Sequence, residues 1–228
     1  MTEFQKRRIL NAGSGVLGHG RIPACFAPDQ WQEVRLDIDP AARPDIVASL
    51  SNMRGKVADA SFDALYSSHA IEHLFAHEVI PAFAEFRRVI KPNGFALVTC
   101  PDLAMIARYL LQHGAEAIAY ESPAGPIRPI DMIFGHSRSI AEGRVAMAHR
   151  TGFTPARLAR VALAAGFGEV RAIEGDYFDM WAIMLGPQAS AAELAPIFAG
   201  SKLARLFGNA PERHQAVAQA PGGANATV

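Results

Sequence analysis

The sequence predicts an α/β fold in which a mostly parallel sheet carries helices on both faces. Three observations support this prediction. Short apolar segments with strand character alternate with amphipathic helical segments through residue 114. A glycine-rich turn follows directly on the first of these strands. Two further strand-like segments, 169–174 and 178–185, are joined by a short link, which predicts an antiparallel hairpin near the C-terminal end.

The expected strands are short apolar segments, two of which end at a proline. They cover residues 8–12, 34–39, 45–50, 62–68 and 95–100, in addition to the hairpin. The expected helices carry apolar residues at helical spacing and begin at capping residues such as Asp102 and Thr154. They cover residues 77–90, 102–114, 154–166 and, with interruptions, 190–207. Arg87 and Arg88, late in the first helix, are expected to be solvated.

Composition bounds the class of protein. The 228 residues contain 22 Lys and Arg against 22 Asp and Glu, and half of the residues are hydrophobic, so the chain is expected to form a globular core. No excess of basic charge favours nucleic acid as a partner. Cys25 and Cys100 form no CxxC pair, which predicts reduced thiols rather than disulfides. No apolar signal or membrane segment is present, so we expect a cytoplasmic protein without a membrane partner.

The glycine-rich turn and an acidic residue further on indicate a bound cofactor. Residues 13–18 read Gly-Ser-Gly-Val-Leu-Gly, and Asp37 ends the next strand, where its carboxylate is placed to accept hydrogen bonds from ribose hydroxyls. The pair indicates an adenosine-containing cofactor without specifying which one. A nicotinamide cofactor needs a helix N-terminus directly after the turn to hold its pyrophosphate. Here the loop continues to Pro23 without a clear helix start, which favours a ligand without phosphates.

Residues 8–100 resemble a class I S-adenosylmethionine-dependent methyltransferase. The motifs that carry the resemblance are Ile-Leu-Asn-Ala-Gly-Ser-Gly at 9–15, Leu-Asp-Ile-Asp-Pro at 36–40, Pro-Asp-Ile-Val at 44–47, the stretch 61–74 that ends in Glu-His-Leu, and the stretch 86–95 that contains Lys-Pro-Asn-Gly. The subgroup that it resembles most has Leu-Asn-x-Gly as its first motif and Glu-His-Leu after strand four. The resemblance implies a Rossmann-like, seven-stranded, mostly parallel sheet with an antiparallel last strand.

The resemblance also implies which residues bind the cofactor. Gly13 and Gly15 would lie along the methionine part, Asp37 would bind the ribose, and Ile38 would flank the adenine. Asn11 and Ser49 stand where the family usually has acidic residues. The full set implied in this way is Asn11, Gly13, Ser14, Gly15, Asp37, Ile38, Ser49, Leu50, Ser67 and Ser68.

Residues 69–73, His-Ala-Ile-Glu-His, admit a second interpretation as an inverted zinc-protease motif. In it His69 and His73 would be ligands and Glu72 the base. That motif belongs inside a long helix with a further ligand downstream, whereas these residues closely follow a strand. We therefore expect no metal. His69 is the expected acceptor contact or general base, because its ordinary pKa lies near working pH, and His73 and His77 are expected to pack or cap.

The segment 114–152 is the expected insertion in a single domain that spans residues 1–208. It is rich in proline and glycine yet contains apolar residues, which must cover something. We expect a lid over the substrate, with His136 and His149, beside Arg138 and Arg150, as acceptor contacts. Packing on the sheet edge or a homodimer contact is the alternative. Residues 209–228 are expected to be a disordered tail.

The expected function is transfer of a methyl group from S-adenosylmethionine to a small-molecule acceptor. O- or N-methylation is favoured over C-methylation, and positioning with help from a general base would suffice. The segment after the fourth strand reads Ser-Ser-His-Ala at 67–70 and lacks the Asn-Pro-Pro-Tyr or Asp-Pro-Pro-Tyr signature, which in the family marks methylation of amino groups on bases or glutamine amides. A non-catalytic S-adenosylmethionine-binding regulatory protein is the second hypothesis, kept open by Asn11 and Ser49. An NAD(P)-dependent oxidoreductase is the third.

Overall fold

The computed structural model describes residues 5–16, 22–208 and 216–219. Its main sheet has the strand order β10-β8-β9-β5-β4-β1-β2-β3. The strands are β1 (Arg7–Ala12), β2 (Trp31–Asp37), β3 (Ile46–Val47), β4 (Phe62–Ser68), β5 (Ile90–Pro101), β8 (Glu169–Glu174), β9 (Asp179–Leu185) and β10 (Ala216–Gln219). Strands β1 to β5 pair in parallel, and β9 is antiparallel to both β5 and β8. The expected mostly parallel sheet with an antiparallel last strand is confirmed.

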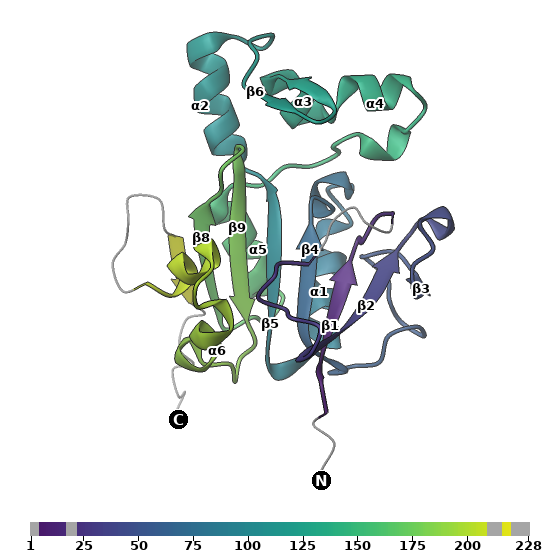
Figure 1. Cartoon of the computed structure of the whole chain (residues 1–228), viewed down its shortest axis with the longest axis vertical. Helices are drawn as coiled ribbons and strands as arrows, with labels where there is room; N and C mark the ends of the chain where they lie inside the picture. The colour runs from purple at the N-terminus through teal and green to yellow at the C-terminus, as the bar shows by residue number, and fades with distance from the viewer. Residues whose placement is uncertain (1–4, 17–21, 209–215, 220–228) are drawn as a thin grey trace, which may run out of the picture.

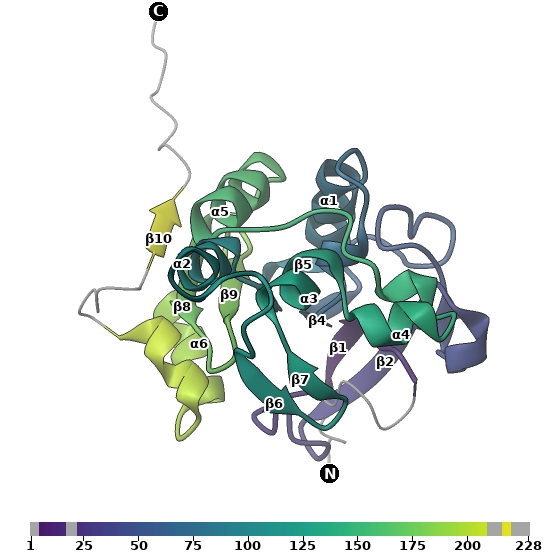
Figure 2. The ribbon, with the colours of Figure 1, turned by 90° about the horizontal axis from the view of Figure 1, so that it is seen from above.

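Helices cover both faces of this sheet (Figure 2). Helices α1 (Val79–Val89) and α5 (Pro155–Ala164) lie together on one face, and α6 (Ala191–Phe198) with the 3-10 helix η4 (Lys202–Phe207) covers the other. Helix α2 (Leu103–His113) rises from the end of β5 (Figure 1). The expected caps are present, since the Asp102 side chain accepts from Ala104 N at 2.8 Å and Thr154 Oγ1 accepts from Arg157 N at 3.2 Å.

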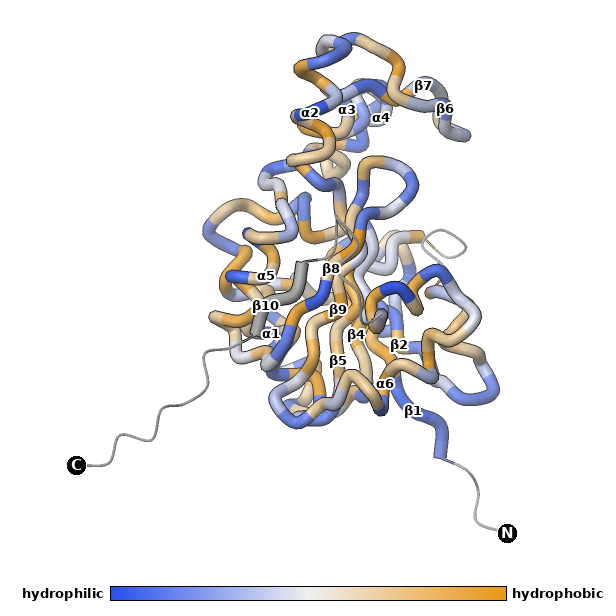
Figure 3. The backbone as a smooth tube through the Cα atoms, turned by 90° about the vertical axis from the view of Figure 1, so that its left-hand side faces the viewer, coloured by the Kyte–Doolittle hydropathy of each residue, from blue (hydrophilic) through white to orange (hydrophobic). Residues whose placement is uncertain are grey.

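Two apolar clusters fill the space between the sheet and its helices. The larger includes Phe83 and Phe86 of α1 and Leu158 of α5, packed on alternate residues of the central strands. The smaller lies on the opposite face and joins Trp31 to Phe198. Figure 3 shows hydrophobic residues concentrated along β4, β5 and β9. Burial of these side chains is the main stabilising contribution to the sheet.

An upper layer follows α2 and lies over the carboxyl ends of the parallel strands (Figures 1 and 2). It consists of the hairpin β6 (Tyr120–Ser122) and β7 (Gly125–Ile127), helices α3 (Pro129–Phe134) and α4 (Ser137–Ala141), and the 3-10 helix η3 (Val145–Met147). Ile127 and Met132 pack against Ile106 of α2 in a small core of their own. The chain then returns beside its point of departure, because Leu103 N donates to Phe153 O at 2.9 Å.

Two strands differ from the expectation. The third expected strand, 45–50, is reduced to Ile46–Val47, because the chain turns back where Ser49 bridges to Asn52. Residues 216–219, within the expected disordered tail, form β10, antiparallel to β8. The other tail residues, 209–215 and 220–228, lie outside the described part of the chain.

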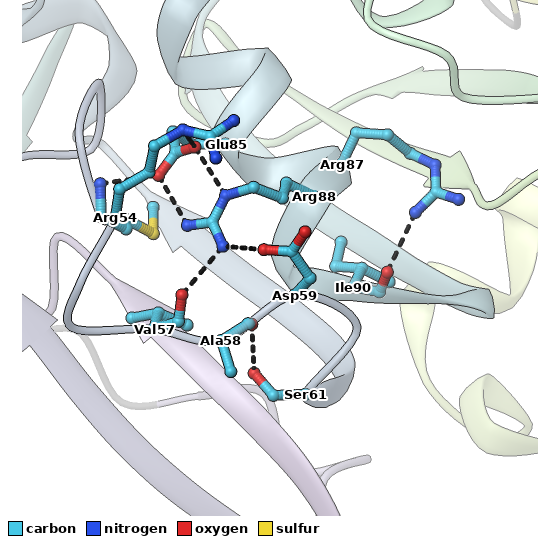
Figure 4. Close-up of polar contacts among 10 residues, drawn as sticks. Arg54, Val57, Ala58, Asp59, Ser61, Glu85, Arg87, Arg88 and Ile90 are labelled. Atoms are coloured by element: carbon cyan, nitrogen blue, oxygen red, sulfur yellow. Dashed lines mark hydrogen bonds and ion pairs between the residues drawn. The ribbon is translucent and has the colours of Figure 1, made fainter.

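The expectation that Arg88 is solvated is wrong. Its side chain is 10% exposed and donates to Glu85 at 2.7 Å, to Asp59 at 2.5 Å and to Val57 O at 2.8 Å (Figure 4). Arg87 is half-buried and donates to Ile90 O at 2.9 Å. Helix α1 therefore holds the loop that leads from β3 to β4.

Among the described residues, no helix has the length and apolar character needed to cross a membrane.

Candidate active site

The glycine turn after β1 is bound tightly to the neighbouring strand. Gly13 and Gly15 have φ values of 76° and 60°, in the left-handed region that favours glycine. Gly13 N and Ser14 N both donate to Leu36 O, at 2.8 and 3.0 Å. A Cβ on Gly13 would lie 2.5 Å from that of Ala70, so the turn also packs closely on the segment after β4. Leu17 and Gly18, the last two residues of the motif, lie outside the described residues.

Asp37, at the end of β2, organises this turn. Its Oδ2 accepts from Gly15 N at 2.7 Å, and its Oδ1 accepts from Asp39 N at 2.9 Å. Each carboxylate oxygen accepts two hydrogen bonds readily, so both retain the capacity to accept from a pair of ribose hydroxyls. Ile38 follows with 68% of its surface exposed, an apolar side chain available to flank a flat ring.

Two serines at the carboxyl ends of central strands also fit a polar ligand. Ser14 Oγ and Ser67 Oγ are buried and have no hydrogen-bond partner among the described residues. Such hydroxyls destabilise a fold unless a ligand or water satisfies them. Ser68, the last residue of β4, is partly exposed at the same edge of the sheet.

Asn11, Ser49 and Leu50 have mainly structural contacts in the described protein. Asn11 is buried and donates through Nδ2 to Glu33 Oε1 at 2.7 Å, which joins β1 to β2. Ser49 Oγ accepts from Ser51 N at 3.2 Å and shapes the turn after β3. Leu50 is buried, and its Cδ1 lies 3.9 Å from the position that a Gly13 Cβ would occupy. Leu50 therefore forms part of the floor beneath the glycine turn.

His69 follows β4 in a strained backbone conformation. Its φ of 46° is unusual for a residue with a side chain, and its amide is fixed by a 2.9 Å hydrogen bond to Thr99 O. The side chain is 54% exposed, and Nδ1 lies 3.2 Å from Glu72 Oε1. Desolvation lowers the pKa of His69, but the hydrogen bond and charge of Glu72 outweigh it, so the pKa is raised overall.

Glu72 is a deeply buried charged side chain near this edge of the sheet. It lies in the 3-10 helix η2 (Ile71–His73), is 2% exposed, and its Oε2 has no partner among the described residues. Burial raises the pKa of Glu72, whereas the hydrogen bond to His69 and the charges of His69 and His73 lower it, and the net direction is down. The backbone carbonyl of Glu72 accepts from Arg150 N and Thr151 N, at 2.9 and 3.2 Å.

The upper layer brings His149 next to His73 and Glu72. The rings of His149 and His73 lie with their centroids 5.1 Å apart. His149 Nδ1 is 2.9 Å from Met132 O, and His73 Nδ1 is 3.1 Å from Ala148 O. Burial lowers the pKa of His149, so its neutral form is favoured. Arg150 extends along the same turn, where it donates to His73 O at 3.2 Å and lies over the ring of Phe75.

The other two residues expected in the lid are not brought into this group. His136 precedes α4 as its N-cap residue, and its Nδ1 lies 2.7 Å from Ser139 Oγ of that helix; its described contacts include neither His69 nor His149. Arg138 is exposed and pairs with Glu142 at 3.1 Å. The long helix in which an inverted zinc-protease motif normally lies is absent at this point, because residues 71–73 form one 3-10 turn. Spacing along the chain does not reveal that His73 meets His149, since the contact joins two distant segments.

Residues 12–98 match a family model described as a methyltransferase domain. Among solved structures, a Pyrococcus horikoshii OT3 protein is 16% identical with a TM-score of 0.53, covering 80% of this chain and 82% of that one. A SAM-dependent methyltransferase from Methanosarcina mazei is 16% identical with a TM-score of 0.51, covering 81% and 94%. The CMeT domain of the citrinin polyketide synthase is 14% identical with a TM-score of 0.54, covering 83% and 48%. No curated protein matches the sequence.

Residues 12–98 therefore carry a methyltransferase domain, and the sheet order and the glycine turn bound to Asp37 agree with a class I methyltransferase fold. The matched methyltransferase domain indicates S-adenosylmethionine as the cofactor.

Proposed function

We propose that this enzyme methylates an oxygen or nitrogen atom of a small molecule that binds between His69 and the upper layer. The single observation that supports this proposal best is the backbone conformation and exposure of His69. A strained backbone projects a half-exposed imidazole from the end of β4, while buried Glu72 holds its Nδ1. Strained residues of this kind cluster at active sites because the surrounding fold must stabilise them.

The chemistry of methyl transfer asks little of the protein beyond orientation and proton removal. S-adenosylmethionine supplies a methyl group already activated on a sulfonium. The glycine turn and Asp37 would hold the donor at the carboxyl ends of β1 and β2. Because the carboxylate of Glu72 accepts the Nδ1 proton of His69, the lone pair of His69 lies on Nε2. Nε2 is then the atom that orients the acceptor group and takes its proton.

The acceptor class is suggested by side chains of the upper layer and of the segment that closes it. Arg150 provides a guanidinium beside the ring of Phe75, and Phe134 and Met147 expose apolar surface on the same layer. This combination favours a small anionic or carbonyl-bearing molecule with an apolar body. His136 remains a proposed acceptor contact only in a bound state in which α4 moves toward the core.

The test is formation of S-adenosylhomocysteine by the full chain with a panel of small phenols, carboxylates and amines. With an acceptor found in this way, His69→Ala should lower kcat by about 100-fold to 10,000-fold, the usual contribution of a general base, and leave donor binding unchanged. The matched control is His77→Ala, which removes an exposed imidazole stacked on Phe75 from the same region. Equal kcat values for the His69 variant and the wild type would exclude the proposed role of His69.

A further inference from the structure

We infer that Glu72, His73 and His149 form a binding site for a divalent transition-metal ion, with zinc as the reference ion. A carboxylate oxygen of Glu72 and one ring nitrogen of each histidine all lie within 4.8 Å of one another. This ligand set differs from the one that the sequence motif suggested, because it omits His69 and takes its third member from the upper layer. Two imidazoles and one carboxylate form a recurring ligand set for zinc and related ions.

Hydrogen bonds hold both histidines in the tautomer that binds a metal ion through Nε2. A backbone carbonyl only accepts hydrogen bonds, so the contacts of His73 Nδ1 with Ala148 O and of His149 Nδ1 with Met132 O place the proton on Nδ1 in both rings. The lone pair of each ring therefore lies on Nε2. Hydrogen bonds of this type from the non-ligating nitrogen are characteristic of metal-binding histidines, whose ring orientation they fix.

Glu72 supplies an independent observation that points to a ligand. Its side chain is 2% exposed, and its Oε2 is buried without a hydrogen-bond partner among the described residues, although Oε1 contacts His69. A buried, unsatisfied carboxylate oxygen is costly, and proteins normally pair it with a donor or a cation. A metal ion between Glu72 and the two imidazoles would satisfy it.

Backbone hydrogen bonds hold the two halves of the site together. Arg150 N and Thr151 N donate to Glu72 O, and His149 N donates to Phe134 O at 3.1 Å. The site thus joins the turn after β4 to the segment that closes the upper layer. Three protein ligands leave a fourth position open, as in catalytic rather than structural zinc sites. The open position is available to an anionic or carbonyl group of the acceptor.

Metal binding is tested on the full chain without donor or acceptor, so that the result does not depend on the proposed methyl transfer. The protein is stripped with chelator and titrated with zinc by calorimetry, and metal content after dialysis is measured by mass spectrometry. We expect one zinc per chain. His149→Ala and His73→Ala should each weaken binding by more than about 100-fold, the upper effect of losing a residue that only supports a ligand.

The control is His69→Ala, which removes the neighbouring imidazole that lies outside the proposed ligand set but inside the protease-like motif. It should retain one zinc. A second readout needs no substitution: on adding zinc to the wild type, imidazole ¹⁵N spectra should show Nε2 of two histidines becoming metal-bound. The assignment would be overturned if the wild type held no stoichiometric zinc, or if the His149→Ala variant retained zinc. It would also be overturned if only the His69→Ala and His73→Ala variants lost zinc.

Discussion

Asp37 illustrates how one side chain serves both the fold and the ligand site. Its two oxygens each accept a backbone N–H, from Gly15 and from Asp39, which fixes the glycine turn relative to the end of β2. The same oxygens are those proposed to accept hydrogen bonds from the donor ribose. The carboxylate is therefore oriented before the donor binds, which reduces the entropy lost on binding.

We predict that Asp37→Ala weakens binding of S-adenosylhomocysteine. Loss of charge-assisted hydrogen bonds of this kind costs about 1.5–3 kcal/mol, or about tenfold to 100-fold in Kd. The measurement is calorimetric titration. The control is Asp39→Ala, which removes a carboxylate two residues away whose contact is the cap of the 3-10 helix η1 (Pro40–Ala42). If both variants bind as tightly as the wild type, the ribose is held elsewhere.

Single residues were predictable where their chemistry is local. The glycines and Asp37 follow one another at a spacing that sequence alone reveals, and in the structure Gly15 N donates to Asp37. Glu72 and His149 were harder, because their contact depends on how the upper layer returns over the turn after β4. Neither the hydropathy pattern nor the residue spacing predicts that the upper layer folds back over this turn.

Helix α1 and the loop before β4 are connected by the buried carboxylate of Glu85. It accepts from Arg88 twice at 2.7 Å and from Met53 N at 2.7 Å. The hydrogen bond from Arg88 is the main cause of the lowered pKa of Glu85, and burial opposes it. The loop that carries Ser49 and Leu50 is thereby attached to a helix of the main core (Figure 4).

We predict that Glu85→Gln lowers the free energy of unfolding near neutral pH by about 2–3 kcal/mol, because Arg88 loses its buried partner. A lowered folded-state pKa means that the contribution of Glu85 is fully present above its ordinary value of 4.5 and disappears as the pH falls through the folded-state value. Urea unfolding of both proteins at several pH values should therefore show the difference shrinking in acid.

The matched control for this element is Asp59→Asn. Asp59 pairs with the same guanidinium, but its side chain is 74% exposed, so the change should cost under about 1 kcal/mol. Equal destabilisation by the two substitutions would contradict the prediction, because the exposed pair with Asp59 would then contribute as much as buried Glu85. The sequence pattern predicts helix α1 but does not predict this hydrogen-bond network. Arg88 contacts Asp59 and Val57 only because the loop folds back onto the helix.

The molecule as a whole combines a sheet core with a separate layer above it. Alternating segments and the hairpin were sufficient to predict the sheet, because parallel crossovers and strand pairing follow general rules. The edge strand β10 was not predictable, because it is defined by backbone pairing with β8 and not by a hydropathy pattern in the sequence. The upper layer was predictable only as an apolar insertion, since its helices are short and its core contains few residues.

Helix α2 and the upper layer that follows it leave and re-enter the core at one point, so the lid proposal is testable by excision of both. Residues 102 and 153 form a parallel bridge, and Leu103 N donates to Phe153 O, so residues 104–152 can be replaced by a short glycine linker at small entropic cost. Phe153 and the main core remain.

We predict that the excised protein folds and binds S-adenosylhomocysteine within a few-fold of the wild type, because the glycine turn and Asp37 lie outside the removed segment, but forms no methylated product. Circular dichroism, calorimetry and product mass are the measurements. Light scattering on both proteins examines the alternative role, since a wild-type dimer that becomes monomeric on excision would make the layer an interface between copies. If the excised protein still turns over, the acceptor must be held by the loops of the core, and His69 would act without a lid.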